Sequence, residues 1–174
     1  MREIITDALV LAKEASGEFD QRVTLFTEGV GLVSAKVTSG RKITSKLSPH
    51  LEPFGFAAVR LVPGRGERNG RSAYHVADAL ERGRLSPPVI SVFGIVRALL
   101  EEGVPDPELW HLFTRGQATP RAALRILGYD AASASCASCG TGAPGYFFFS
   151  ELRYRCAACL PPKSERGAYV EVHG

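Results

Sequence analysis

Four cysteines carry the most specific chemical signal in this 174-residue chain, which has no others: Cys136, Cys139, Cys156 and Cys159. They form two Cys-x-x-Cys pairs with sixteen residues between the pairs. Thiolate is a soft ligand, zinc binds four thiolates tetrahedrally, and each tight turn can direct two sulfurs to one ion. The pattern therefore predicts one structural zinc ion with no open coordination position for catalysis.

Two other interpretations of the cysteines remain open at this point. They could be two reduced pairs without metal, or redox-active cysteines. A redox Cys-x-x-Cys normally opens a helix after a strand, which neither pair is expected to do. The stretch between the pairs, YFFFSELRYR, predicts a short hairpin. Its residues Phe147 to Phe149 are expected to cover the zinc module or dock it to helices, and the alternative is stacking on a base.

Basic side chains are concentrated in one segment of the chain. Residues 1–35 hold three basic and six acidic side chains, residues 36–76 hold eight and two, and the remainder holds ten of each. A cluster of cations on loops is typical of a surface that follows nucleic-acid phosphates, and the alternative is a solvated polar loop. The predicted DNA-binding residues are the eight cations of this segment: Lys36, Arg41, Lys42, Lys46, Arg60, Arg65, Arg68 and Arg71.

Residue patterns for catalysis or for a membrane are missing from the sequence. Its four histidines match no triad or metal-ligand spacing, and it has neither a phosphate-binding loop nor a catalytic carboxylate pair. No apolar run approaches the roughly 18 to 20 residues that cross a bilayer, and the N-terminus does not resemble a signal peptide. We therefore expect a cytoplasmic protein that is not an enzyme, contacts no membrane and has no small-molecule substrate.

The elements that must position these residues begin with short strands. The runs IITDALVLAK, RVTLFTE and GLVSAKV suit strands, and glycine-containing turns separate them. Two more runs, FAAVRLV and SAYHV, bring residues 1–77 to five strands, the size of a small closed barrel. The expected fold is α+β with an N-terminal five-stranded OB-fold barrel, and an SH3-like barrel is the alternative.

Helical spacing replaces strand spacing after residue 77. Val92, Val96 and Leu100 recur at helical intervals, and Gly103 is the expected C-terminal cap. Asp106-Pro107 and Thr119-Pro120 each place an N-cap residue before a proline, which predicts two further helices. The expected organisation is an OB-fold DNA-binding domain over 1–77, a short helical domain over 78–135, and a four-cysteine zinc module with a short C-terminal tail over 136–174.

Several segments, taken in their order, resemble the bacterial recombination mediator family RecO. In the barrel these are GEFD (17–20), LFTEGVGLVSA (25–35), SGRK (39–42) and SKLSPHLEPF (45–54). The later string RILGYDAASASCASCG (125–140) is similar to the segment in which that family's last helix before the zinc site enters the first cysteine pair. The resemblance implies an OB-fold followed by a helical domain with a zinc site. Compared with the family, we expect this chain to be shortened at the C-terminus.

The resemblance also implies partners and a function. RecO proteins bind single- and double-stranded DNA, anneal complementary strands, contact single-stranded-DNA-binding protein and work with RecR to load the recombinase RecA. Arg121 and Arg125, one helical turn apart, are candidates to hold the acidic C-terminal tail of single-stranded-DNA-binding protein, and the alternative is that they face water. We expect a non-enzymatic recombination mediator at the nucleoid. A zinc-stabilised adaptor of a repair complex and a zinc-dependent nucleic-acid hydrolase are the alternatives.

Overall fold

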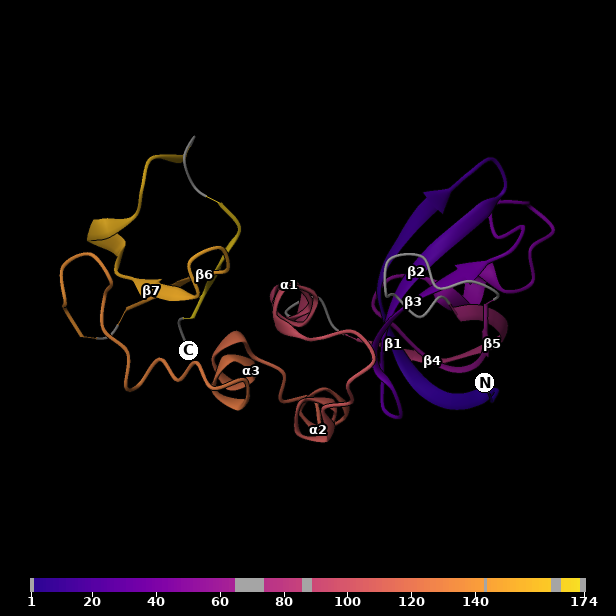
Figure 1. The fold of residues 1–174 in the computed structure, drawn as a ribbon, viewed down its shortest axis with the longest axis horizontal. Coiled ribbons are helices and arrows are strands. Elements are labelled where there is room, and N and C mark those ends of the chain that lie inside the picture. Colours follow the sequence, from indigo (N-terminus) through magenta and orange to yellow (C-terminus); the bar gives the residue numbers. More distant parts are fainter. Residues whose placement is uncertain (1, 65–73, 86–88, 143, 164–166, 173–174) are drawn as a thin grey trace. The chain divides into compact units, whose positions relative to one another are not determined.

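The computed structural model describes residues 2–64, 74–85, 89–142, 144–163 and 167–172. The chain divides into two units (Figure 1). The first consists of Met1–Pro87 and Leu100–Pro107, and the second of Pro88–Leu99 and Glu108–Gly174. Each unit has its own sheet and is described by itself.

Five strands close into a barrel in the first unit (Figure 1). They are β1 (Ile4–Ser16), β2 (Asp20–Thr27), β3 (Gly31–Val37), β4 (Gly55–Pro63) and β5 (Tyr74–Arg84), with the 3-10 helix η1 (Ser48–Leu51) between β3 and β4. The order is β1-β2-β3-β5-β4, with β4 pairing back to β1, and only the β3–β5 pair is parallel. This arrangement confirms the predicted five-stranded OB-fold barrel.

The barrel interior follows from the alternation of apolar and polar residues along its strands. In β3, Val33, Ala35 and Val37 are buried while Ser34 and Lys36 are half-buried on the other face. Successive side chains of a strand point to opposite faces, so a closed barrel puts one set inside. These inward residues join apolar side chains from all five strands in a single core.

Strand β5 is longer than the sequence predicted. It runs to Arg84 and pairs with β4 as far as Gly55, beyond the boundary expected at residue 77. The stretch ADALERGR is rich in helix-forming residues, and two register shifts in the β4–β5 ladder interrupt the alternation that marks a strand. Pairing with β4 outweighs this local helix preference. Without β5, the backbone N–H and C=O groups on that edge of β4 would have no strand partner.

The chain returns to the barrel after the first helix. Gly103 donates its N–H to the Leu32 carbonyl at 2.9 Å, and a Cβ on Gly31, which has a φ of 68°, would meet the Val104 carbonyl oxygen at 1.9 Å. Glycine is therefore required at position 31. Gly103 is not the helix cap that was expected, because the helix ends at Leu99 and Gly103 forms a turn against β3.

Three short helices begin the second unit: α1 (Ile90–Leu99), α2 (Pro107–Thr114) and α3 (Pro120–Ile126). The predicted start of α3 is confirmed, since the Thr119 hydroxyl accepts the N–H of Ala122 at 3.2 Å with Pro120 in the first turn. Trp110 and Phe113 of α2 are buried, as expected for helix-packing residues. In the described part of the chain, no helix is long and apolar enough to cross a membrane.

A three-stranded antiparallel sheet, with strand order β7-β6-β8, completes the second unit. The predicted hairpin is present as β6 (Tyr146–Phe148) and β7 (Arg153–Arg155). Strand β8 (Tyr169–Glu171) pairs with the other edge of β6, so part of the segment expected to be a tail belongs to the sheet. Phe147 and Phe148 are buried, which excludes them as base-stacking surfaces, while Phe149 is half-buried.

Candidate metal centre and nucleic-acid interface

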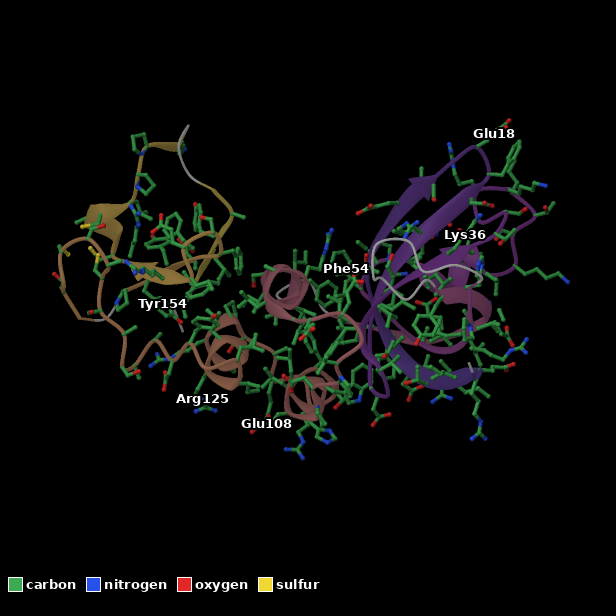
Figure 2. All side chains as sticks on the ribbon, viewed as in Figure 1. Glu18, Lys36, Phe54, Glu108, Arg125 and Tyr154 are labelled. Atoms are coloured by element: carbon green, nitrogen blue, oxygen red, sulfur yellow. The ribbon has the colours of Figure 1, made fainter. Side chains whose placement is uncertain are left out.

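The four cysteines come together beside the small sheet, where Figure 2 shows their sulfur atoms gathered at one place. All four Sγ atoms lie within 4.8 Å of one another, and those of Cys139 and Cys156 are 3.7 Å apart. Two sulfurs bound to a tetrahedral ion at about 2.3 Å each are roughly 3.8 Å apart. The cluster therefore has the donor set and the dimensions of a tetrahedral metal site.

Backbone hydrogen bonds shape the turns that present the sulfurs. Gly140, with a φ of 75°, donates its N–H to the Cys136 carbonyl at 2.8 Å and closes the first turn. Cys159 closes the second turn by donating to the Cys156 carbonyl at 3.1 Å. The two turns are joined because the Cys156 N–H points to the Cys136 sulfur at 3.4 Å. The position of the Cys136 sulfur thus depends on the backbone of the second pair.

The same contacts set the protonation of the thiols. The N–H groups of Cys156 and Cys139 lower the pKa of Cys136 to about 6. Hydrogen bonds to Thr141 lower the pKa of Cys139. The neighbouring Cys139 and Cys156 sulfurs raise the pKa of Cys159 to about 12. Without a metal, the cluster therefore keeps a proton on Cys159 at neutral pH, and a cation that takes all four thiolates must displace it.

An aromatic core holds the cysteine turns against the rest of the unit. The ring of Phe147 lies with its centroid 5.0 Å from those of both Tyr129 and Tyr154. The Tyr154 hydroxyl donates to the Tyr129 carbonyl at 2.6 Å, and burial raises the pKa of this phenol to about 12. The Tyr154 carbonyl accepts the N–H of Ala137, between the first two cysteines. Tyr154 of β7 therefore connects the small sheet to the loop before the cysteines and to the first cysteine turn.

At one end of the barrel, two loops meet and carry four of the eight predicted DNA-binding residues. We call this region the barrel tip: the β1–β2 turn with the start of β2 (residues 17–22), and the end of β3 with the loop after it (residues 36–47). It contains five basic and two acidic side chains. Arg41 joins the two loops, since its N–H donates to the Phe19 carbonyl at 2.9 Å and its Nη1 to the Gly17 carbonyl at 3.0 Å.

Arg41, Lys42 and Lys46 are exposed cations on the loop of the barrel tip that follows β3. The Lys42 Nζ lies 5.3 Å from the centroid of the Phe19 ring. Within the described part of the chain, none of these three cations pairs with a carboxylate. Their full charge therefore faces the solvent at this end of the barrel.

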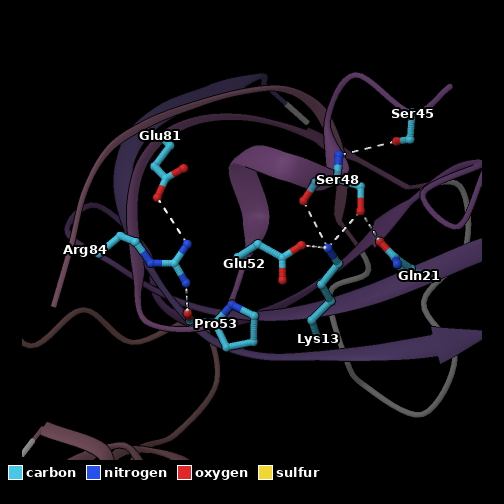
Figure 3. A network of polar contacts seen from close by, with 8 residues as sticks. All are labelled: Lys13, Gln21, Ser45, Ser48, Glu52, Pro53, Glu81 and Arg84. Carbon is cyan, nitrogen blue, oxygen red and sulfur yellow. Dashed lines mark hydrogen bonds and ion pairs between the residues drawn. The ribbon is translucent and has the colours of Figure 1, made fainter. Parts of the chain in front are cut away.

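A polar network under η1 anchors the end of this loop (Figure 3). Lys13 of β1, with a side chain only 11% exposed, donates to the Ser48 carbonyl at 2.9 Å and to the Ser48 hydroxyl at 2.7 Å. It also pairs with Glu52 at 2.6 Å. Ser48 in turn donates its hydroxyl to Gln21, and its N–H points to the Ser45 hydroxyl. The paired ammonium group of Lys13 therefore holds η1 on the barrel, and η1 in turn fixes the end of the loop 36–47.

The other predicted DNA-binding residues have different surroundings. Lys36 pairs with Asp20 at 2.6 Å, and this contact, with the Ser39 N–H, lowers the pKa of that carboxyl. Arg60 pairs with Glu3 at 3.3 Å, beside the start of β1, whereas the tip lies beside the end of β1. The structure therefore does not bring Arg60 together with the tip cations. Arg65, Arg68 and Arg71 lie outside the described residues.

Sequence reasoning missed one cation of the tip. Arg22 of β2 is exposed and lies directly opposite Lys36 of β3, with its Nη1 3.2 Å from the Ser34 hydroxyl. The register of the β2–β3 hairpin could have indicated this. Once Thr27 pairs with Gly31 at the turn, Arg22 must pair with Lys36, five residues from the turn on each strand. Along the chain Arg22 lies in the acidic segment 1–35, and only the pairing across the hairpin places it beside Lys36.

Arg121 and Arg125 lie on the exposed side of α3 and line one surface pocket of about 240 Å³. Thr119, Ala122, Asp130 and Ala132 complete its lining. Two guanidinium groups beside alanine methyl groups form a pocket that suits an acidic ligand with an apolar part. Asp130 offsets part of the positive charge.

Comparison with known proteins agrees with this architecture. Residues 1–79, which span the barrel up to the middle of β5, match the family described as "Recombination protein O N terminal". Over 168 residues, covering 83% of this chain and 66% of the relative, the chain is 32% identical to the DNA repair protein RecO of Geobacter metallireducens.

Other relatives carry the same description. The DNA repair protein RecO of Streptomyces avermitilis is 27% identical over 82% of this chain and 68% of its own length. That of Dehalococcoides mccartyi is 40% identical over 60 residues, which is 34% of this chain and 24% of the relative. The chain thus spans about two thirds of the length of the relatives that it matches most fully.

Proposed function

This chain belongs to the RecO family of DNA repair proteins, and on that basis we propose that it is a recombination mediator without catalytic activity. It binds single- and double-stranded DNA, promotes annealing of complementary strands and, with RecR, loads RecA. These activities belong in the cytoplasm, at the nucleoid. A role in DNA repair follows from the family, whereas the individual activities are the proposal.

The observation that carries DNA binding is the barrel tip. Arg41, Lys42 and Lys46 present three exposed cations without a carboxylate partner among the described residues, on a loop that the Lys13 network and the β1–β2 turn hold in place. Cations fixed on a barrel loop attract the phosphates of a nucleic-acid strand and release its counterions. Phosphate contacts position a strand without reading its bases, so we expect little dependence on sequence.

Titration of the full chain with labelled single- and double-stranded oligonucleotides over a salt series tests this proposal. Three phosphate contacts at about −0.7 each predict a slope near −2 for log affinity against log salt with single strands. The oligonucleotides should remain uncleaved. A slope near zero, or cleavage of the DNA, would contradict the proposal.

A protein adaptor is the second candidate, and one feature favours it. Ile5 and Leu80, 77% and 59% exposed, line one surface pocket of about 150 Å³ on the outside of the barrel. Exposed apolar side chains beside a hollow are typical of a protein-docking site. A negligible salt slope together with binding to another repair protein would favour the adaptor over the DNA-binding mediator.

We assign zinc to the four-cysteine cluster, with one ion per chain and a structural role. Four thiolates suit a soft tetrahedral ion and leave no coordination position for a substrate. When bound, the ion would supply a link between the two cysteine turns. The chain's own contribution is the set of N–H groups that favour thiolates at Cys136 and Cys139.

The pocket beside α3 is assigned to the acidic C-terminal tail of single-stranded-DNA-binding protein. Replacing both Arg121 and Arg125 by alanine should weaken binding of a peptide with that tail sequence at least about tenfold, since hydrogen bonds to charged groups contribute about 1.5 to 3 kcal/mol each. Fluorescence anisotropy with a labelled peptide measures this. Affinity for bare DNA should hardly change, because neither residue is part of the barrel tip.

Arg153→Ala is the matched control for this pair. Arg153 is an exposed arginine on β7 that does not line the pocket, so its loss should leave peptide binding unchanged. Unchanged peptide affinity in the double variant would show that the pocket does not hold the tail.

A further inference from the structure

The β1–β2 turn presents an aromatic ring to solvent at the barrel tip. Phe19 is 48% exposed in the turn, and Ile43, in the facing loop, is fully exposed. Figure 2 labels Glu18, the preceding residue, at the outer end of this hairpin. Two large apolar side chains among charged neighbours are not needed for the barrel core, which is built from inward-facing residues of the strands. Their position therefore points to a ligand with an apolar face.

The backbone around Phe19 is well held although its side chain is exposed. Its carbonyl accepts the N–H of Arg41 at 2.9 Å, and Asp20 next to it accepts the N–H of Ser39 at 2.8 Å. The Arg41 guanidinium adds a bond to the Gly17 carbonyl. The ring is thus presented from a turn tied to the neighbouring loop, so little conformational freedom remains to be lost on binding.

The charges around Phe19 indicate which ligand fits. Lys42 lies 5.3 Å from the ring centroid, and Arg41 and Lys46 are on the same loop without a carboxylate partner among the described residues. An exposed ring between cations matches a strand whose phosphates alternate with flat bases. In duplex DNA the base faces are covered by their neighbours, so only an unpaired base can offer its face to Phe19.

We propose that Phe19, supported by Ile43, stacks on an unpaired base while Arg41 and Lys42 hold the adjoining phosphates. This inference rests on the proposed DNA binding and adds to it a reason for preferring single strands. Each base stacked on an aromatic side chain contributes about tenfold or more in affinity.

The test compares an oligonucleotide of about 15 thymidines, within the site size of an OB-fold, with an abasic strand of equal length and charge. The full metal-loaded chain should bind the thymidine strand about tenfold more tightly than the abasic strand. Phe19→Ala should bring this ratio close to one and leave the abasic affinity and the salt slope unchanged. Phe19→Trp should keep the preference, because an indole also stacks.

The control is Ile90→Ala, which removes an exposed apolar side chain at the start of α1 and should change neither affinity. If Phe19→Ala binds the thymidine strand as tightly as the parent chain, or loses affinity for both strands equally, base stacking is overturned. Salt-dependent binding would then still support the phosphate contacts. If neither strand binds, both the stacking and the proposed DNA binding are wrong.

Discussion

Replacing Cys139 by serine is expected to abolish tight zinc binding and to disorder the region from Cys136 to the end of β8. Structural zinc sites contribute about 10 to 16 kcal/mol of binding energy, and that energy stabilises the fold around them. The sheet here has three strands of three residues each, which is too little to stand without further support. Elemental analysis should fall from about one zinc per chain to nearly none, and limited proteolysis should cut within this region.

Ser138→Ala is the control for the cysteine variant. Ser138 lies between the two cysteines of the first pair and is exposed, so alanine changes the side chain but keeps the backbone N–H that faces Cys136. Zinc content and resistance to proteolysis should match the parent chain. A metal-free parent chain that is folded and has four reactive thiols would refute the metal site, and iron in place of zinc would refute the assignment of the ion.

Zinc affinity should fall as the pH falls. At neutral pH the free cluster has Cys136 largely as thiolate, because its pKa is lowered to about 6, and Cys159 as thiol, because its pKa is raised to about 12. Binding must release at least the Cys159 proton, so affinity should decrease by at least about tenfold for each pH unit. Below about pH 6, Cys136 also takes up a proton, and the dependence becomes steeper. Competition with a chromophoric chelator at several pH values measures this slope.

The second large effect is expected from the triple variant Arg41→Ala, Lys42→Ala and Lys46→Ala. Three lost ionic contacts that are exposed to solvent, at up to about 1 kcal/mol each, correspond to roughly 100-fold weaker binding to single-stranded DNA at low salt. The slope of log affinity against log salt should become shallower by about 2, at about 0.7 per contact. All sequences should be affected alike, because the contacts are to phosphates. A titration over a salt series, with zinc content checked, provides both numbers.

A charge-matched control separates this surface from a general effect of net charge. The variant Arg2→Ala, Arg82→Ala and Arg84→Ala also removes three positive charges, two of which are paired with Asp7 and Glu81. It should retain most of the affinity. Equal losses in the two triple variants would mean that the overall field attracts DNA, and unchanged binding in the first would remove the barrel tip as the interface and favour the adaptor function.

Much of the architecture could be predicted because it depends on residues close together in the chain. The alternation in β3, the Thr119-Pro120 start of α3 and the paired cysteine turns each arise within a few residues. The segments that resemble RecO proteins follow the same order along the chain as in that family, so the amino-acid sequence is enough to recognise them. Sequence by itself therefore determined the barrel, the helices, the set of thiol ligands and the family.

Contacts between distant segments were decided only by the tertiary structure. Strand β5 extends to Arg84 because β4 needs a partner, against the helix preference of its residues, and β8 is recruited by the free edge of β6. The local sequence of each segment does not specify the edge that it will meet. For this reason the extension of β5 to Arg84 and the strand β8 were not predicted.

The charges of the candidate site show the same limit. All eight cations of residues 36–76 look equivalent in the sequence, yet Lys36 pairs with Asp20, and Arg60 lies opposite Ile5 at the start of β1, where it pairs with Glu3. Coulomb energy depends on distance in space and on solvent exposure, and closure of the barrel sets both. That closure also brings the Phe19 turn against the loop of Lys42, which creates an aromatic and cationic surface from two segments more than twenty residues apart.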